Sequence, residues 1–238
     1  MNFATLKGLT IPEGSVESIA IGGQTVWAKA PDDPWAAVFA SIDDGTYKEK
    51  YSIGDTVPLD LGSEGVVNME VVGIDVNDLA DGSGKAPISW ISKETLNTQH
   101  RMNPALVTND DGTYQEGTGT IGGWGSSEMR AYLNNTILPL IPENVRGMIK
   151  TVTNKQASYN TAGTKETQYT EDSVWIPLHT GGGLTYSNKK RNQTNNPVEW
   201  WCRNARSTTS FYSIDTYGSF GSIKKANLSY SIALGFCT

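Results

Sequence analysis

The sequence predicts an α+β domain, with helices in its first two thirds and short strands gathered at its end. Three observations support this prediction. Residues 35–42 repeat apolar side chains at helical spacing. Residues 198–236 are dense in aromatic and β-branched residues and are interrupted by Gly and small polar residues, which is typical of antiparallel strands joined by tight turns. The 25 Gly and 10 Pro indicate many turns, and therefore short elements joined by long loops.

Residues 1–30 are predicted to form a separate unit, an N-terminal β-hairpin that serves as a docking segment, followed by a linker. Two alternating runs, at residues 16–21 and 24–28, flank Gly22 and Gly23, and this is a strong hairpin signal. Because a lone hairpin is only marginally stable in water, its apolar side chains are expected to pack on something else. Residues 31–238 then form the main domain.

The main domain is expected to open with a helix over residues 35–42. Asp33 is placed to cap this helix, and Pro34 suits its first turn. Further short helices are expected at residues 94–98, from Ser126, and at residues 137–149, where Pro139 and Pro142 interrupt the pattern. Strands are expected at residues 57–61, 66–74, 87–91, 150–154 and 173–176.

Three polar stretches, at residues 103–123, 155–171 and 178–197, are expected to be loops or inserts on the surface. The first contains Gly117-Thr-Gly-Thr-Ile-Gly122, which matches the dinucleotide-binding pattern GxGxxG. That pattern has its physical meaning only directly after a strand, and here a turn signal precedes it. We therefore interpret it as an ordinary loop.

The formal net charge is −6 and the pI is about 5.0, so a nucleic-acid partner is not expected. No apolar run approaches the roughly 18 residues of a membrane helix, and the first residues lack the features of a signal peptide. We therefore expect synthesis in the cytoplasm without membrane insertion. Cys202 and Cys237 fall in segments predicted to share one sheet, where a disulfide or two buried thiols could form, and a reducing compartment favours thiols.

Groups suited to catalysis or metal binding are scarce. The chain has only two histidines, His100 and His179, which excludes three-His and HExxH metal sites, and no GxSxG elbow accompanies either. The acidic residues at 75–81 lack the glycine and the closing glutamate of a calcium loop. No catalytic residue, metal site or cofactor is predicted, and the protein is not expected to be an enzyme.

The C-terminal block supplies the candidate binding surface. Because successive side chains of a strand face opposite ways, about half of this block is core, and Trp201, Phe211 and Phe236 are the best candidates. The other half would expose Tyr, Arg, Asn and Ser, which is a composition typical of recognition surfaces; a plain solvated face is the alternative. The predicted ligand-binding residues, helped by the loop at residues 181–196, are Asn204, Arg206, Ser210, Tyr212, Asp215 and Tyr217.

Several motifs, in order and approximate spacing over residues 35–238, resemble a domain-of-unknown-function family of Gram-positive gut bacteria and their phages. The motifs are Gly122-Gly-Trp-Gly-Ser-Ser-Glu-Met-Arg-Ala-Tyr-Leu-Asn134, Leu138-Pro139, Ile149-Lys-Thr-Val-Thr153, Asp172-Ser-Val-Trp175, Trp200-Trp-Cys-Arg203 and Ala233-Leu-Gly-Phe-Cys237. The segment at residues 6–14, with Val26 and Trp27, is similar to N-terminal segments of phage tail proteins.

The resemblance implies a C-type-lectin-like fold for the C-terminal half, with its last strands and loops facing a ligand. The same fold serves formylglycine-generating enzymes and phage receptor-binding proteins diversified by retroelements. This sequence lacks the Glu-Pro-Asn and Trp-Asn-Asp motifs of calcium-dependent lectins and the closely spaced cysteine pair of those enzymes. The resemblance therefore implies neither calcium-dependent sugar binding nor that enzymatic activity.

Three hypotheses for function follow. The first is a phage virion protein, at a tail fibre tip or another exposed position and present as a homo-oligomer. Residues 1–29 would contact other virion proteins, and the C-terminal strands would bind a host-surface glycan or protein. The second is a structural decoration or assembly protein of the particle without receptor binding. The third is a cell-wall-degrading enzyme that uses Asp and Glu as its acid–base pair.

Overall fold

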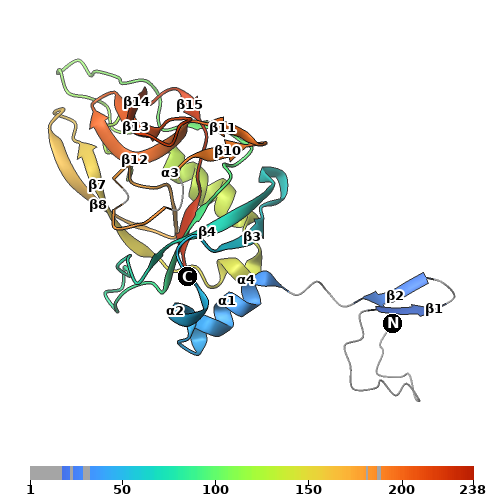
Figure 1. The fold of residues 1–238 in the computed structure, drawn as a ribbon. Coiled ribbons are helices and arrows are strands. Elements are labelled where there is room, and N and C mark those ends of the chain that lie inside the picture. The colour runs from blue at the N-terminus through green and yellow to red at the C-terminus, as the bar shows by residue number, and fades with distance from the viewer. Residues whose placement is uncertain (1–17, 22–23, 29–32, 181, 187–188) are drawn as a thin grey trace.

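The computed structural model describes residues 18–21, 24–28, 33–180, 182–186 and 189–238, with side chains described from residue 33 onward. Most of its regular structure consists of short strands in several small antiparallel sheets (Figure 1). Helices make up only 17% of the structure. The prediction of an α+β domain with a C-type-lectin-like fold is therefore wrong. Two expected helical stretches do not form as continuous helices. Two stretches expected to be loops or inserts, at residues 155–171 and 178–197, contain strands.

The predicted N-terminal hairpin is confirmed. Strands β1 (Ser18–Ile21) and β2 (Gln24–Ala28) pair antiparallel on either side of the Gly-Gly turn signal. The expected packing of its apolar side chains, and most of the segment predicted to dock to other virion proteins, lie outside the described residues.

The first helix of the main domain is also confirmed, as α1 (Pro34–Asp43). A carboxylate oxygen of Asp33 accepts a hydrogen bond from the backbone N–H of Trp35 at 2.9 Å, so the cap forms as predicted. Trp35 is buried, and its ring contacts Trp90 and Phe236 with centroids 5.0 and 5.7 Å apart. A short helix, α2 (Tyr47–Lys50), follows α1.

A five-stranded antiparallel sheet forms the centre of the main domain. Its order is β3 (Thr56–Asp60), β4 (Val66–Ile74), β5 (Ile88–Ser92), β16 (Gly235–Cys237) and β9 (Val174–Trp175). The 3-10 turn η2 (Gly62–Glu64) joins β3 to β4. Gly235 is required because a Cβ there would overlap the ring of Trp175. The last strand of the chain is thus inserted between two strands from much earlier in the sequence.

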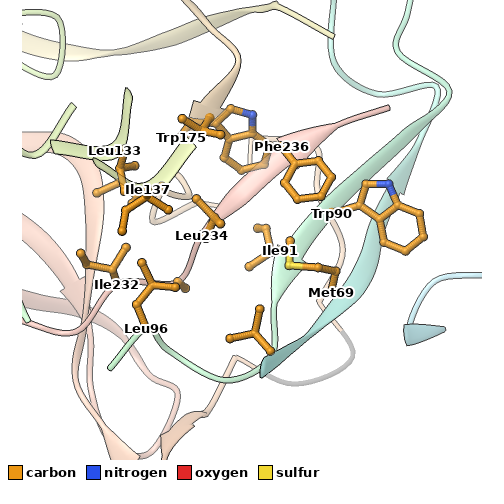
Figure 2. Close-up of a cluster of buried hydrophobic side chains, with 14 of the residues drawn as sticks. Met69, Trp90, Ile91, Leu96, Leu133, Ile137, Trp175, Ile232, Leu234 and Phe236 are labelled. Carbon is orange, nitrogen blue, oxygen red and sulfur yellow. The ribbon is translucent and has the colours of Figure 1, made fainter. Parts of the chain in front are cut away.

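The main core lies on this sheet. Figure 2 shows Phe236 between the rings of Trp90 and Trp175, with Leu133 and Ile137 pointing toward Leu234. All six of these side chains are fully buried. Burying a large apolar side chain contributes about 1.5–3 kcal/mol relative to leaving it exposed. Trp201 and Phe211 are also buried, so all three predicted core aromatics of the C-terminal block are confirmed.

The remaining strands form four smaller antiparallel sheets. The sheets are β6 (His100–Arg101) with β15 (Ser229–Tyr230), β7 (Val152–Tyr159) with β8 (Lys165–Asp172), β10 (Arg191–Gln193) with β11 (Asn196–Val198), and the order β12 (Trp200–Ser207), β13 (Ser210–Ile214), β14 (Phe220–Lys225). The antiparallel strands predicted for the C-terminal block are therefore present as β12 to β14.

The other predicted helices differ from the structure. Ser127, rather than Ser126, caps α3 (Glu128–Tyr132), which continues as a π-helical turn, η3 (Leu133–Ile137). The stretch at residues 137–149 breaks into the 3-10 turn η4 (Leu138–Leu140) and α4 (Glu143–Arg146), because two prolines interrupt it. Residues 94–98 form no helix. Ser92, just before this stretch, is not a helix cap: it belongs to β5, and its hydroxyl accepts a hydrogen bond from the backbone N–H of Leu234.

The polar insert predicted at residues 155–171 is mostly the hairpin β7–β8, paired over eight rungs. Its inward face is polar, since Asn154, Gln156 and Ser158 are buried in place of apolar residues. The alternation that normally reveals a strand is therefore hidden in this segment. The loop predicted at residues 103–123 is confirmed, and the GxGxxG match within it follows no strand.

Cys202 and Cys237 lie in different sheets, on β12 and β16, contrary to the prediction that they share one. Both are buried and free, so the expectation of two thiols is confirmed. Among the helices of the described residues, none combines the length and the apolar composition needed to cross a bilayer.

Candidate functional site

Two of the six residues predicted to bind a ligand are well exposed. Arg206 is exposed on β12, and Tyr217 is 85% exposed in the turn between β13 and β14. Asp215 holds this turn, because its carboxylate accepts hydrogen bonds from the N–H groups of Tyr217 and Ser219 at 2.9 and 2.8 Å. Ser210 is buried at the start of β13. Ligand binding by these residues stays a prediction.

Asn204 and Tyr212, the other two predicted residues, meet at His179. Asn204 is buried, with 5% of its surface exposed, contrary to the prediction of an exposed side chain, and Tyr212 is half-buried. The carbonyl oxygen of the Asn204 side chain accepts from the backbone N–H of His179 at 3.1 Å, which places its amide nitrogen 2.6 Å from Nδ1 of the ring. An amide nitrogen can only donate, so Nδ1 accepts, and the neutral ring carries its proton on Nε2. Asn204 therefore fixes both the position and the tautomer of His179.

His179 is the centre of an aromatic ledge, which we define as His179, Tyr212 and Phe220. The ring of His179 is stacked on that of Tyr212, with centroids 3.9 Å apart and planes 5° apart. Phe220 meets the same imidazole edge-on at 6.4 Å. The ammonium group of Lys189 lies 3.6 Å from the centroid of Phe220, which is a close cation–π contact. The ledge is partly exposed and gives the three-stranded sheet an aromatic border.

An open groove of about 600 Å³ lies between the hairpin β7–β8 and β12. These elements are side by side (Figure 1). We call this feature the β7–β12 groove. Because Asn204 lines it and also binds His179, the aromatic ledge begins at the wall of the groove. The side chains that define it include Lys155, Ala157, Lys165, Thr167, Leu178 and Asn204.

Two of the motifs that resemble a known family, at residues 122–134 and 172–175, meet in the interior around Asp172. Its fully buried carboxylate accepts from Nε1 of Trp124 and Nδ2 of Asn154 at 3.1 and 2.9 Å. The hydroxyl of Thr170 donates to it at 2.7 Å, and Nε of Arg130 at 2.6 Å. These motif residues therefore build the scaffold and do not line the groove.

The loop that carries Lys189 is anchored by a buried ion pair between Arg191 and Glu70. The atoms Nη2 and Oε2 are 2.9 Å apart, and neither side chain is exposed. The guanidinium group also lies 5.8 Å from the ring of Tyr186 and 5.9 Å from that of Trp200. Because Glu70 belongs to β4, this pair connects the loop beside the aromatic ledge to the central sheet.

The two cysteine thiols and the imidazole of His100 pack within the fold, away from the groove. Burial raises the pKa of both thiols, that of Cys237 to about 12, so they stay protonated at neutral pH. The ring of His100 is stacked on Tyr132, and its Nε2 lies 3.6 Å from a carboxylate oxygen of Glu128. Within the described part of the chain, no three His, Cys, Asp or Glu side chains are grouped so that they could hold a metal ion.

The partly buried position of His179, against Tyr212 and Asn204, predicts that the stability of the protein depends on pH. Burial lowers the pKa of its imidazole below the ordinary value of 6.5. The neutral imidazole is therefore favoured by folding. Its contribution to stability is complete above pH 6.5, the pKa in the unfolded chain, and is lost as the pH falls through the lower pKa of the folded protein. We expect the melting temperature to fall less between about pH 7.5 and about pH 5 in His179→Phe than in the wild type. Tyr212→Phe keeps the stack and should retain the wild-type slope; equal slopes in all three proteins would contradict the expectation.

The sequence analysis identifies Asn204 but not the other residues that line the groove, nor His179. Leu178 and His179 lie in a stretch expected to be a loop, and the hairpin residues Lys155, Ala157, Lys165 and Thr167 lie in the expected polar insert. A signal for the hairpin exists, since alternating residues on both sides of residues 160–163 include Tyr and Thr. No local signal places this hairpin beside β12, which comes about forty residues later in the chain.

Comparison with known proteins gives one match. A family model described as a domain of unknown function, DUF6273, matches residues 91–236, which is more than half of the chain. No curated protein and no solved structure matches the chain. The matched region includes β7, β8, β12 and the aromatic ledge.

Proposed function

The chain belongs to the DUF6273 family, and from this premise we propose that it is a non-catalytic binding module carried on a phage or prophage particle. It attaches the particle to a ligand on the host surface through the β7–β12 groove and the aromatic ledge. Several copies act together as a homo-oligomer, which multiplies weak contacts.

The observation that carries this proposal is the groove itself. It has about the volume of a ligand pocket, and it combines amide, hydroxyl and cationic side chains with an apolar one at Leu178. The adjacent ledge offers rigid aromatic area at a low cost in entropy. His179 is held in its contact by Asn204 and Tyr212, so the ledge is preorganised before a ligand arrives.

The position on a particle is supported by sequence resemblance. Residues 6–14, with Val26 and Trp27, are similar to N-terminal segments of phage tail proteins. In this proposal residues 1–29 contact other virion proteins and leave the groove free to face the host. The protein is then made in the bacterial cytoplasm and reaches the outside with the released particle.

A structural role in the particle, without receptor binding, is the second candidate. It is favoured by Tyr217, Phe220 and Ile223, which are large exposed side chains on or beside the edge strand β14. Such residues suit a contact with a neighbouring subunit. This candidate predicts assembly into the particle and no attachment to host cells.

The experiment that tests the proposal uses Thr167→Trp, which places an indole in the groove. Thr167 is exposed, so the free energy of unfolding should change by less than about 0.5 kcal/mol. Binding of the protein, displayed in many copies on beads, to cell walls of Gram-positive gut bacteria should fall at least about tenfold because the ligand is excluded.

The matched control is Thr56→Trp, at an exposed threonine of the edge strand β3. It should bind as the wild type does. Equal binding by both variants would contradict the role of the groove. If the wild type releases soluble fragments and lowers the turbidity of the walls, the protein is an enzyme and the proposal is wrong.

A further inference from the structure

The β7–β12 groove carries positive charge in a protein whose net charge is −6. Lys155 and Lys165 line it, and Arg206 lies beside it, two residues after Asn204 on β12. None of these three cations has a carboxylate within ion-pair distance among the described residues. Lys48, Lys85 and Lys224 do have such partners, namely Asp75, Asp78 and Glu199. Glu166 is the single acidic residue that lines the groove.

The two lysines are spaced along the hairpin. Its register opposes Lys155 to Tyr169, Ala157 to Thr167, and Tyr159 to Lys165. Residues of one rung, and residues two apart on a strand, share a face of the sheet. Lys155 and Lys165 therefore lie at the two ends of one face, about 13 Å apart along the strands. The small residues Ala157 and Thr167 form the floor between them.

Each of these lysines stands next to a tyrosine. The ammonium group of Lys155 lies 5.7 Å from the ring centroid of Tyr169, which is 62% exposed. Tyr159, opposite Lys165, donates its hydroxyl hydrogen to the backbone carbonyl of Arg206 at 3.0 Å. That hydrogen bond brings the exposed Arg206 to the same end of the groove as Lys165. This face of the hairpin thus has a lysine and a tyrosine at each end.

From this arrangement we propose that the β7–β12 groove binds a segment of an anionic polysaccharide, with negative groups repeated along the chain; this deepens the proposed function and rests on it. Two cationic ends separated by a small, uncharged floor fit a linear polymer better than one compact anion. The exposed ring of Tyr169 suits the apolar faces of sugar units. The hydroxyl of Thr167 and the second amide hydrogen of Asn204 suit sugar hydroxyls.

The anionic groups can be carboxylates or phosphodiesters, because both accept hydrogen bonds from Lys and Arg. A nucleic acid is the less suitable polyanion. Binding its backbone requires a longer track of clustered Lys and Arg than three cations on a protein of net charge −6.

The test measures binding of the full chain to immobilised polymers by interferometry. The probes are polygalacturonate, which carries carboxylates, polyribosylribitol phosphate, which carries phosphodiesters between its sugar-containing units, neutral dextran, and single-stranded DNA. At least one of the first two should bind about tenfold more tightly than dextran. Raising the NaCl concentration from about 0.1 M to about 1 M should remove this preference, because the Debye length shortens to about 3 Å.

The variant Lys155→Gln with Lys165→Gln should weaken binding to the preferred polymer about tenfold. The control variant Lys93→Gln with Lys225→Gln removes the same charge from exposed lysines that do not line the groove and should bind normally. Tightest binding to DNA, salt-independent binding to dextran, or equal losses in both variants would overturn the inference. So would a failure to bind either anionic polymer, whereas the cell-wall assay with Thr167→Trp decides the proposed function separately.

Discussion

Replacement of Asp172 by alanine is expected to lower the free energy of unfolding by about 3–5 kcal/mol. The carboxylate is fully buried, and it accepts hydrogen bonds from Trp124, Asn154, Thr170 and Arg130. Its removal leaves a guanidinium group that is 30% exposed without its carboxylate, and it leaves three neutral donors without an acceptor. Because these donors come from the loop before α3, from α3 and from β7–β8, the loss should loosen the packing between these elements. Urea unfolding followed by tryptophan fluorescence measures the change.

The matched control is Asp110→Ala, at an exposed aspartate in the turn at residues 109–112. Its unfolding free energy should stay within about 0.5 kcal/mol of the wild type. Trp124→Phe, which removes one donor and keeps an aromatic ring, should lie between the two. If Asp172→Ala costs no more than the control, the buried network does not stabilise the fold and the account of these motifs is wrong.

Replacement of Glu70 by glutamine is expected to destabilise the protein by about 3 kcal/mol, because it removes the buried carboxylate that faces the buried guanidinium group of Arg191. Burial already lowers the pKa of the Arg191 guanidinium, and the carboxylate of Glu70 opposes this effect. The loop that carries Lys189 should also lose its attachment to β4. If the proposed function holds, binding to cell walls is expected to weaken together with stability, and thermal unfolding and the cell-wall assay measure the two effects.

The double variant Glu70→Met with Arg191→Met removes both charges and keeps apolar volume in the site. It should be more stable than Glu70→Gln, since the buried guanidinium group is removed together with its carboxylate. A double variant that is less stable than the single one would show that hydrogen bonds of these residues, and not the charge pair, carry the stability.

Several elements could be predicted from the sequence because their signals are local. The helix α1 follows from Asp33, Pro34 and apolar spacing, and all three act within a few residues of one another. The hairpin β1–β2 follows from a Gly-Gly pair between alternating runs. Trp201 and Phe211 were predicted to be core because large aromatic side chains at alternate strand positions gain most from burial.

The candidate site could be predicted only in part. Asn204, Arg206 and Tyr212 were chosen for their composition, and the structure places all three at or near the groove or its aromatic ledge. Ser210 and Asp215 also have a suitable composition, but Ser210 is buried. The carboxylate of Asp215 accepts a hydrogen bond from the backbone N–H of Tyr217 within the turn. Composition identifies which residue types suit recognition, but it does not reveal which of them the protein itself already uses.

The sequence by itself determined several local elements and the aromatic core residues of the C-terminal strands. Only the tertiary structure decided that the last strand enters the central sheet, that a polar hairpin is half buried, and that this hairpin faces β12 across a groove. The physical reason is that a buried polar side chain such as Asn154 or Gln156 looks like a surface residue until its partner is known. Those partners lie on other elements, and only folding brings them together.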